Sequence, residues 1–395
     1  MVDPQIVEPQ ILKPHSLKPL AVYVHIPFCI SKCHYCDFNS YQGMLNHQHE
    51  YFSALDKEIE KFSPEFKERG VETIFFGGGT PTSVDTEYLV EIISKLKIYQ
   101  QCVLDGQLEV SIECNPGTVD LKKLKILRQA GFNRMSFGLQ SANDDELLML
   151  GRIHKFDQFE EAFTDARAVG FENINVDLMF GIPNQTLKSW RDTINSILKL
   201  RPEHISAYSL MIEEGTPFYE KGKARLLNLP NDEDEREMYQ LAIHLFADAG
   251  YCHYEISNWS LLRKECLHNM TYWNCEEYIG LGAGAHSYLD GSRFGNVNGI
   301  VDYINSSPDS VNENEIYKIN FSEQMKEFVM LGLRCMKGVS QKDFQIKFGV
   351  SVLEVFKNEI NKLVGKGIIQ VSENFVRLTR HGLDFANEAF MEFVG

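Results

Sequence analysis

Six strand-like segments alternate with helix-like segments in the first half of this chain of 395 residues. The strand-like segments are residues 21–26, 73–76, 108–113, 134–138, 173–179 and 204–210, and helical periodicity is clearest over residues 121–130, 156–169 and 190–200. Gly131 and Gly170 stand where two of the helices should end. Alternating units of this kind predict an α/β fold with a parallel sheet, and six of them predict a partial (β/α)6 barrel that is open on one side.

Polar and glycine-rich motifs stand at the ends of these predicted strands. The cysteine loop 29–36 follows the first strand, and the glycine-rich block 77–82 follows the second. Glu113 ends the third strand, Gln140 follows the fourth, and Asp177 lies near the end of the fifth. Because the carboxyl ends of barrel strands gather on one face, we expect these groups to form a single site.

Three cysteines in the first of these loops, Cys29, Cys33 and Cys36, have Cys-x3-Cys-x2-Cys spacing. Cysteine thiolates hold iron–sulfur clusters, and a [4Fe–4S] cube with three protein ligands keeps one iron open for another molecule. A structural zinc loop is the alternative, but zinc sites usually pair Cys-x2-Cys with a second pair of Cys or His. The spacing therefore favours a [4Fe–4S] cluster as the metal group.

The composition restricts the classes of partner. A net charge of −16 argues against a general nucleic-acid binder and against an anionic membrane surface, so at most a peripheral membrane contact is expected. An odd number of cysteines, nine, without a secretion pattern suits a reducing cytoplasm. Prolines recur every five residues from Pro4 to Pro19, which predicts an extended tail over residues 1–19.

The last part of the chain differs from the rest. Residues 305–315 are polar and without periodicity, so they read as a linker. Residues 316–395 have the outline of a small, mainly helical, winged-helix-like domain. Ten Lys or Arg against nine Asp or Glu over residues 320–395 weaken a DNA-binding role for this domain.

The cysteine loop resembles that of the radical S-adenosylmethionine (SAM) superfamily, in which SAM chelates the open iron and an electron from the cluster cleaves it. The glycine-rich block is not a nucleotide phosphate loop, because it lacks Gly-Lys-Ser/Thr. By the resemblance, the glycine turn and Glu113 meet the ammonium of SAM, Arg152 pairs with its carboxylate, Gln140 and Asp177 hold the ribose, and Tyr35 contacts adenine. The expected cofactor-binding residues are thus Tyr23, Tyr35, Gly78, Gly79, Thr80, Glu113, Gln140, Arg152 and Asp177. Taken singly, Glu113 or Asp177 is more often a structural charge.

Longer motifs narrow the resemblance. Residues 23–29, 77–82, 138–141, 177–183 and 254–258 are similar to the oxygen-independent coproporphyrinogen III oxidase superfamily, over nearly the whole chain from residue 20. The true oxidases carry a further cysteine two residues after the third cluster ligand, where this chain has Phe38. The other branch, the HemW-type heme chaperones, ends its cysteine loop in Cys-Asp-Phe and carries His-Asn-x-x-Tyr-Trp, which is found here at residues 268–273.

The resemblance implies that His268 ligates heme, with Tyr272 and Trp273 beside the macrocycle in a partly exposed site. From its chemistry alone, His268 is more often a packed core histidine. Cys266 and Cys275 flank the motif as alternative ligands or as ordinary buried thiols. The cofactors implied are therefore the [4Fe–4S] cluster, SAM and heme.

Three functions remain open from the sequence. The first is a heme chaperone that receives electrons for its cluster and delivers heme to apoproteins, including respiratory ones. The second is a coproporphyrinogen III oxidase, and the third is a winged-helix regulator that senses heme or redox state. The expected domains are a tail at residues 1–19, the barrel at 20–250, a post-barrel segment with the His268 motif and the linker at 251–315, and the accessory domain at 316–395.

Overall fold

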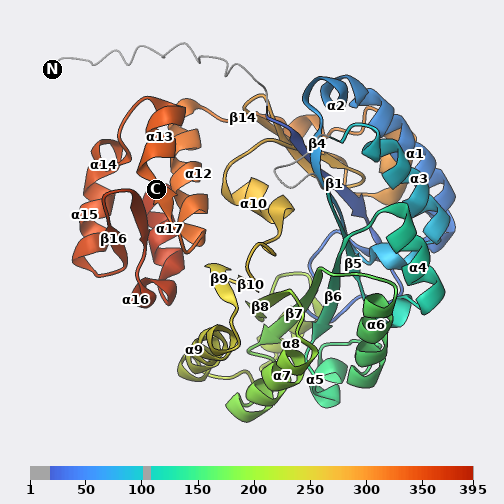
Figure 1. Cartoon of the computed structure of the whole chain (residues 1–395), viewed down its shortest axis with the longest axis horizontal. Helices are drawn as coiled ribbons and strands as arrows, with labels where there is room; N and C mark the ends of the chain where they lie inside the picture. The colour runs from blue at the N-terminus through green and yellow to red at the C-terminus, as the bar shows by residue number, and fades with distance from the viewer. Residues whose placement is uncertain (1–17, 101–107, 395) are drawn as a thin grey trace.

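A twelve-stranded sheet forms the centre of the molecule in the computed structural model, which describes residues 18–100 and 108–394. Almost all of the predicted tail, residues 1–17, lies outside the described residues. In spatial order the strands are β14 (Tyr317–Lys318), β13 (Ser292–Gly295), β12 (His286–Leu289), β11 (Tyr278–Leu281), β1 (Leu20–Ile26), β4 (Val71–Gly78), β5 (Glu109–Cys114), β6 (Arg134–Gln140), β7 (Ile174–Phe180), β8 (His204–Ser209), β10 (Asn258–Ser260) and β9 (Cys252–Glu255). The strands β9 and β14 are the two edges, so the sheet curves into a barrel that does not close (Figure 1).

The six predicted strands are all present as β1, β4, β5, β6, β7 and β8, and they pair in parallel in that order. This confirms the α/β partial barrel. A seventh strand, β11, was not predicted; it pairs in parallel with β1 on the other side. β11 has only four residues and includes Gly280, so its sequence carries no strand pattern of its own.

Helices cover the outer face of the parallel strands (Figure 1). The helices before the C-terminal domain are α1 (Gln48–Lys61), α2 (Ser63–Arg69), α3 (Thr86–Lys97), α4 (Leu121–Ala130), α5 (Asp144–Met149), α6 (Phe156–Ala168), α7 (Leu187–Leu200), α8 (Pro217–Lys223), α9 (Asp232–Asp248), α10 (Leu267–Trp273) and α11 (Ile300–Ser306). The helix α4 shows why the predicted boundaries hold: Asp120 accepts a hydrogen bond from the backbone N–H of Lys123, and Gly131 ends the helix at a φ of 115°.

The two faces of the sheet have different chemistry. In β1, Leu20, Val22, Val24 and Ile26 belong to the hydrophobic core beneath the helices. Alternate residues must then point toward the barrel axis, and on β5 the inward residues are Glu109, Ser111 and Glu113. The barrel interior is therefore polar, and it is where groups that bind or react can be held.

The segment after residue 250 is part of the barrel sheet. Strands β9 to β13 extend it at both edges, and β14 at Tyr317–Lys318 still pairs with β13. The predicted linker at 305–315 packs on the barrel, where Asn296 and Val311 form a β-bridge. The accessory domain was expected to begin at residue 316, and it would then include β14, which is a strand of the barrel sheet. Short strands that pair with distant parts of the chain leave no periodic signal in the sequence.

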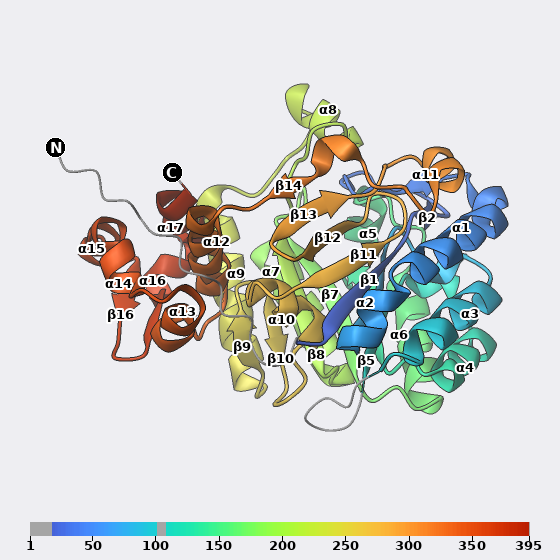
Figure 2. The ribbon, with the colours of Figure 1, turned by 90° about the horizontal axis from the view of Figure 1, so that it is seen from above.

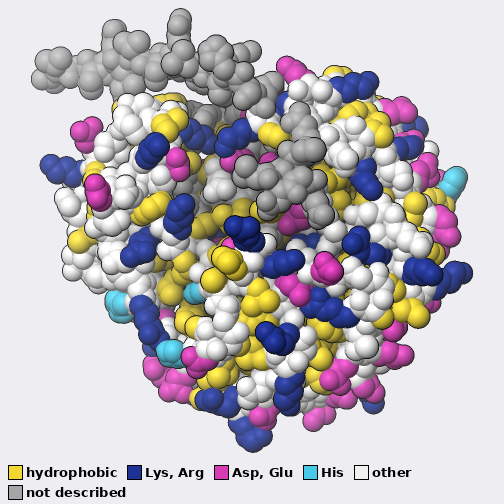
Figure 3. Space-filling model, viewed as in Figure 1, with side chains coloured by type: hydrophobic (Ala, Val, Ile, Leu, Met, Phe, Trp, Pro, Cys, Tyr) yellow, Lys and Arg dark blue, Asp and Glu magenta, His cyan; other side chains and the backbone are white. Residues whose placement is uncertain are grey.

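The C-terminal domain begins with α12 (Phe321–Arg334) and has its own hydrophobic core. Its other elements are β15 (Val339–Ser340), α13 (Gln341–Phe348), α14 (Val352–Val355), α15 (Lys357–Gly365), β16 (Ile369–Val371), β17 (Phe375–Leu378), α16 (Arg380–Leu383) and α17 (Ala386–Val394). Helices packed on the small sheet β15-β17-β16 confirm the winged-helix-like prediction. It lies beside α9 and α10 (Figure 2), and on the face in Figure 3 its acidic and basic side chains are interspersed.

Candidate functional site

The cysteine loop follows β1 and is held at both ends. The short strands β2 (Phe28–Cys29) and β3 (Tyr41–Gln42) pair with each other across the loop, and Lys32 Nζ donates to the backbone oxygens of Phe38 and Ser40 at 3.1 and 3.2 Å. The Cys29 Sγ lies 3.7 Å from Thr80 Oγ1, and the Cys36 Sγ lies 4.0 Å from Ser40 Oγ. The fold thus positions the three predicted thiols in one structured loop at the barrel end.

The donor set of this loop is three thiols from one short segment. A [4Fe–4S] cube binds each thiolate at a different iron, so three thiolates leave one iron open for another molecule. Among residues 18–100 and 108–394, no three His, Cys, Asp or Glu side chains are grouped as ligands of a single metal ion. Burial raises the pKa of the Cys29 and Cys36 thiols, so a metal group would have to displace their protons.

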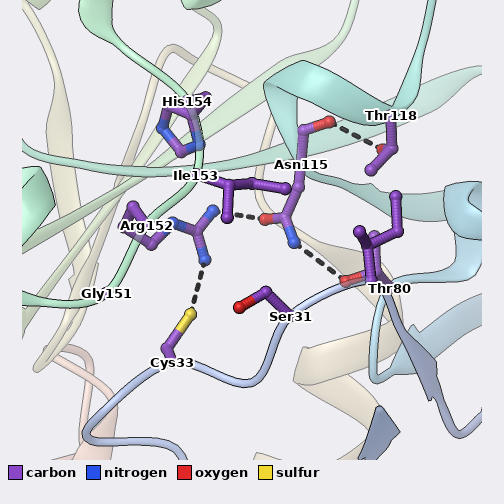
Figure 4. A pocket seen from close by; sticks show the side chains of 10 residues that line it. Ser31, Cys33, Thr80, Asn115, Thr118, Gly151, Arg152, Ile153 and His154 are labelled. Atoms are coloured by element: carbon purple, nitrogen blue, oxygen red, sulfur yellow. Dashed lines mark hydrogen bonds between the residues drawn. The ribbon is translucent and has the colours of Figure 1, made fainter. Parts of the chain in front are cut away.

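Arg152 faces the cysteine loop across a pocket shown in Figure 4. Its Nη1 donates to Cys33 Sγ at 3.3 Å, and its Nη2 contacts Asn115 Oδ1 and the Gly138 backbone oxygen. Its Nε is buried and has no hydrogen-bond partner among the described residues. This guanidinium lies beside the predicted cluster cysteines and still has an N–H group without an acceptor among the described residues. It is therefore suited to bind the carboxylate of a ligand.

Several residues of this pocket were missed by the sequence analysis. They are Ile30, Ser31, Asn115, Thr118, Gly151, Ile153 and His154. Asn115 donates to Thr80 Oγ1 at 2.8 Å and so links the predicted Thr80 to Arg152. The sequence signal that could have pointed to Asn115 was its position two residues after Glu113, just past the end of the third predicted strand. His154 is buried, and burial, with Arg152 nearby, lowers its pKa to about 3.

Glu113 and the glycine-rich turn are in direct contact. Glu113 Oε2 accepts a hydrogen bond of 3.1 Å from the Gly78 backbone N–H. Burial, and then the nearby Asp177, raise the pKa of Glu113 to about 8. A bound ammonium group would offset the cost of burying a negative charge and would favour the ionised form of Glu113. This is the behaviour expected of a residue that accepts hydrogen bonds from the SAM amino group.

Asp177 and Gln140 lie on neighbouring strands. Asp177 Oδ1 accepts from Asn175 Nδ2 at 2.7 Å, and its Oδ2 accepts from Ser136 Oγ at 3.4 Å. Burial raises the pKa of Asp177. Gln140 ends β6 with a φ of 77°, and its buried Oε1 has no partner among the described residues. This free acceptor is compatible with a ligand hydroxyl at the same end of the barrel.

The two predicted tyrosines have different surroundings. Tyr35 packs against a small apolar cluster that includes Leu150, Met179 and Phe218, beside the cysteine loop. Tyr23 points into the barrel, where its hydroxyl lies 3.0 Å from His25 Nδ1 and its ring stacks on Phe75. His25 Nε2 in turn lies 2.8 Å from the backbone oxygen of Asn39, three residues after Cys36.

His268 does not lie in the partly exposed site that was expected. Its side chain is buried in the barrel interior at the opposite ends of the strands, 1% exposed. Its Nδ1 lies 2.8 Å from Thr73 Oγ1, and its Nε2 lies 2.8 Å from Tyr272 OH. Thr73 is five residues before Gly78 on β4, but the ring centroid of His268 lies only 6.4 Å from that of Tyr23, one of the predicted SAM residues.

The helix that carries His268, α10, is held at both ends. At its start the Glu109 carboxylate accepts from the backbone N–H groups of Leu267 and His268, both at 3.1 Å. At its end the Arg334 guanidinium of α12 lies 4.6 Å from the centre of the Trp273 ring. Figure 1 shows α10 between the barrel strands and the C-terminal domain.

Comparison with known proteins identifies the family. The radical SAM superfamily matches residues 23–197, and the HemN C-terminal domain matches residues 322–385. The heme chaperone HemW of Bacillus subtilis is 41% identical over 376 residues, which cover 95% of this chain and 99% of that protein. The chain belongs to the HemW family. The HemW proteins of Lactococcus lactis and Escherichia coli are 33% and 30% identical, each over 95% of this chain and 97% and 98% of their own.

The fold of this HemW-family chain also has a solved relative. The coproporphyrinogen III oxidase HemN of Escherichia coli, a radical SAM enzyme, superposes with a TM-score of 0.82 at 23% identity, covering 95% of this chain and 90% of that one. The radical SAM domain implies SAM and a [4Fe–4S] cluster as cofactors. Within the described residues, no helix is long and apolar enough to span a membrane.

Proposed function

We propose that this chain is a heme chaperone, which binds heme and delivers it to acceptor apoproteins in the cytoplasm. The observation that carries the proposal is the 41% identity, over 95% of the chain, to a protein named heme chaperone HemW. Two local features support it: Phe38 stands where the oxidase branch has a further cysteine, and residues 268–273 complete the His-Asn-x-x-Tyr-Trp motif. The acceptors we expect include apoproteins of the respiratory chain.

The cluster and SAM would occupy the end of the barrel where the strands finish. Cys29, Cys33 and Cys36 would hold the [4Fe–4S] cluster, which supplies single electrons when an external donor reduces it. The residues that would hold SAM are Tyr23, Tyr35, Gly78, Gly79, Thr80, Glu113, Gln140, Arg152 and Asp177. Arg152 and Glu113 have complementary tasks, since one is a cation for the carboxylate and the other an acceptor for the ammonium.

Heme would be ligated by the imidazole of His268. Burial, and then Arg134, lower the pKa of His268 to about 3, so its imidazole is neutral at physiological pH and keeps a lone pair. Tyr272 and Trp273 come from the same helix and would lie against the macrocycle. This assignment requires α10 to present His268 differently from its position in the structure.

The alternative function is oxygen-independent coproporphyrinogen III oxidase activity. The HemN enzyme, which has a similar fold, is named for this activity. One experiment separates the two functions. Anaerobically reconstituted protein is incubated with SAM, reductant and coproporphyrinogen III, and a parallel sample is titrated with heme. We expect a Soret band from bound heme and no protoporphyrinogen IX. Robust formation of protoporphyrinogen IX would overturn the chaperone assignment.

His268 is tested within the same experiment. His268→Ala should weaken heme binding or change the Soret spectrum, while iron and sulfide per chain stay the same. Cys252→Ala is a matched control, since Cys252 is an exposed thiol outside both sites. Unchanged heme binding and transfer by the His268 variant would remove this residue from the site.

A further inference from the structure

His268 has no lone pair free for iron in this structure. A neutral imidazole has one N–H and one lone pair, and both nitrogens lie 2.8 Å from hydroxyl oxygens, those of Thr73 and Tyr272. In either tautomer the lone pair accepts a hydrogen bond. The ring also stacks on Phe75 at 5.2 Å between centroids, and the residue is 1% exposed. Heme iron therefore cannot reach His268 while α10 keeps this position.

The contact that holds the start of α10 comes from β5. Glu109 is 7% exposed, and its two carboxylate oxygens accept the backbone N–H groups of Leu267 and His268 at 3.1 Å each. The Cys266 Sγ also lies 3.7 Å from Glu109 Oε1. Hydrogen bonds to a buried carboxylate are stronger than those between neutral groups, so this bidentate contact anchors the first turn of the helix.

We propose that Glu109 is a positioning residue that latches the His268 helix inside the barrel, and that heme ligation requires the latch to open. The inference rests on the proposed heme-binding function and adds the step that makes its ligand available. Glu109 on β5 and Thr73 on β4 hold α10 from two strands. When a ligand binds only an open conformation, its apparent affinity is reduced by the fraction of molecules that are open. Weakening the latch therefore strengthens heme binding.

Two variants open the latch by different routes. Glu109→Gln keeps the shape of the side chain, but its NH2 end replaces one of the two carboxylate oxygens and cannot accept the N–H group at that position. Thr73→Val is nearly isosteric and removes only the hydroxyl beside His268 Nδ1, without changing a charge. Ser111→Ala is the matched control, because Ser111 is buried on the same strand as Glu109 and its hydroxyl has no partner among the described residues.

The experiment measures heme association by stopped-flow at the Soret band and heme affinity at equilibrium, with cluster-loaded full-length protein. We expect Glu109→Gln and Thr73→Val to bind heme about tenfold more tightly and faster than the wild type, and Ser111→Ala to match the wild type. A purely structural role for Glu109 predicts lower thermal stability without this gain. If Glu109→Gln does not fold, Thr73→Val decides the question alone.

A double variant tests whether the gain passes through His268. Adding His268→Ala to either latch variant should abolish the gain and the Soret signature of the histidine ligand. Equal or weaker heme binding by both latch variants would overturn the latch while leaving heme binding intact. A gain that survives His268→Ala would also overturn it. Absence of any heme binding by the wild type would instead overturn the proposed function, and the latch with it.

Discussion

Single glycines decide how closely the cysteine loop approaches β4. A Cβ atom on Gly79 would lie 2.6 Å from the Phe28 backbone oxygen, and one on Gly78 would lie 2.5 Å from the His25 ring. Gly78 also has a φ of 112°, which other residues rarely adopt. The sequence resemblance predicted that SAM meets this turn, which stays a prediction; the protein atoms closest to these two glycines belong to His25 and to the segment that carries Cys29.

Replacing one of these glycines should therefore disturb the metal site. In Gly79→Ala the new methyl group meets backbone atoms that cannot turn away, so the cysteine loop must shift, at a cost of about 1–3 kcal/mol. We expect fewer iron and sulfide ions per chain and a lower melting temperature. Gly117→Ala is the control, because nothing lies within 4 Å of its Cβ position. Normal cluster content in Gly79→Ala would show that the loop does not depend on this contact.

At the scale of elements, one buried carboxyl group joins its own helix to three other segments. Glu58 of α1 accepts from the Gly282 N–H at 2.8 Å, from Asn296 Nδ2 at 2.7 Å and from Tyr303 OH of α11 at 2.6 Å. Burial outweighs these donors and raises the pKa of Glu58 from 4.5 to about 7. The helix α1 is thereby tied to the loop after β11 and to α11 through an acid that is mostly protonated below neutral pH.

The raised pKa of Glu58 makes stability depend on pH with a definite sign. The folded protein holds this proton more tightly than the unfolded chain, so the contribution is complete below pH 4.5 and is lost as pH rises through 7. The difference between the two pKa values corresponds to roughly 3 kcal/mol. Glu58→Gln should flatten this part of the profile when melting temperature is followed from pH 5 to 8. Parallel profiles for variant and wild type would contradict the assignment.

Elements with a regular pattern were predictable, and elements defined by distant pairing were not. The strands β1 and β4 to β8 and the helices α4, α6 and α7 have clear apolar periodicity, and their positions were predicted to within a few residues. The strand β11 has four residues, and its partner β1 lies more than 250 positions earlier.

The functional residues divide in the same way into those with a local sequence pattern and those defined by distant contacts. The cysteine spacing is local, whereas the contacts of His268 with Thr73 and Glu109 join segments that are far apart in the chain.

At the scale of the whole molecule, the C-terminal domain is joined to the barrel beside α10. Arg334, the last residue of α12, donates to Glu255 Oε1 at 2.6 Å, and its guanidinium lies 4.6 Å from the Trp273 ring centre. Glu255 is fully buried, whereas the Arg334 side chain is 29% exposed. Lys347 of α13 adds a hydrogen bond of 3.0 Å to the Cys275 backbone oxygen. The end of the His268 helix is thus in contact with the accessory domain.

Removing this guanidinium should loosen the joint between the two domains. Arg334→Ala leaves the buried Glu255 carboxylate without its cation and uncovers Trp273, so we expect a loss of about 2 kcal/mol of stability. Trp190 and Trp259 are fully buried, so a red shift of tryptophan emission would report the new exposure of Trp273. Arg380→Ala is the control, because Arg380 is exposed and contacts His244 on the distant side of the same interface. An unshifted emission spectrum and an unchanged melting temperature in Arg334→Ala would mean that this pair does not hold the domains together.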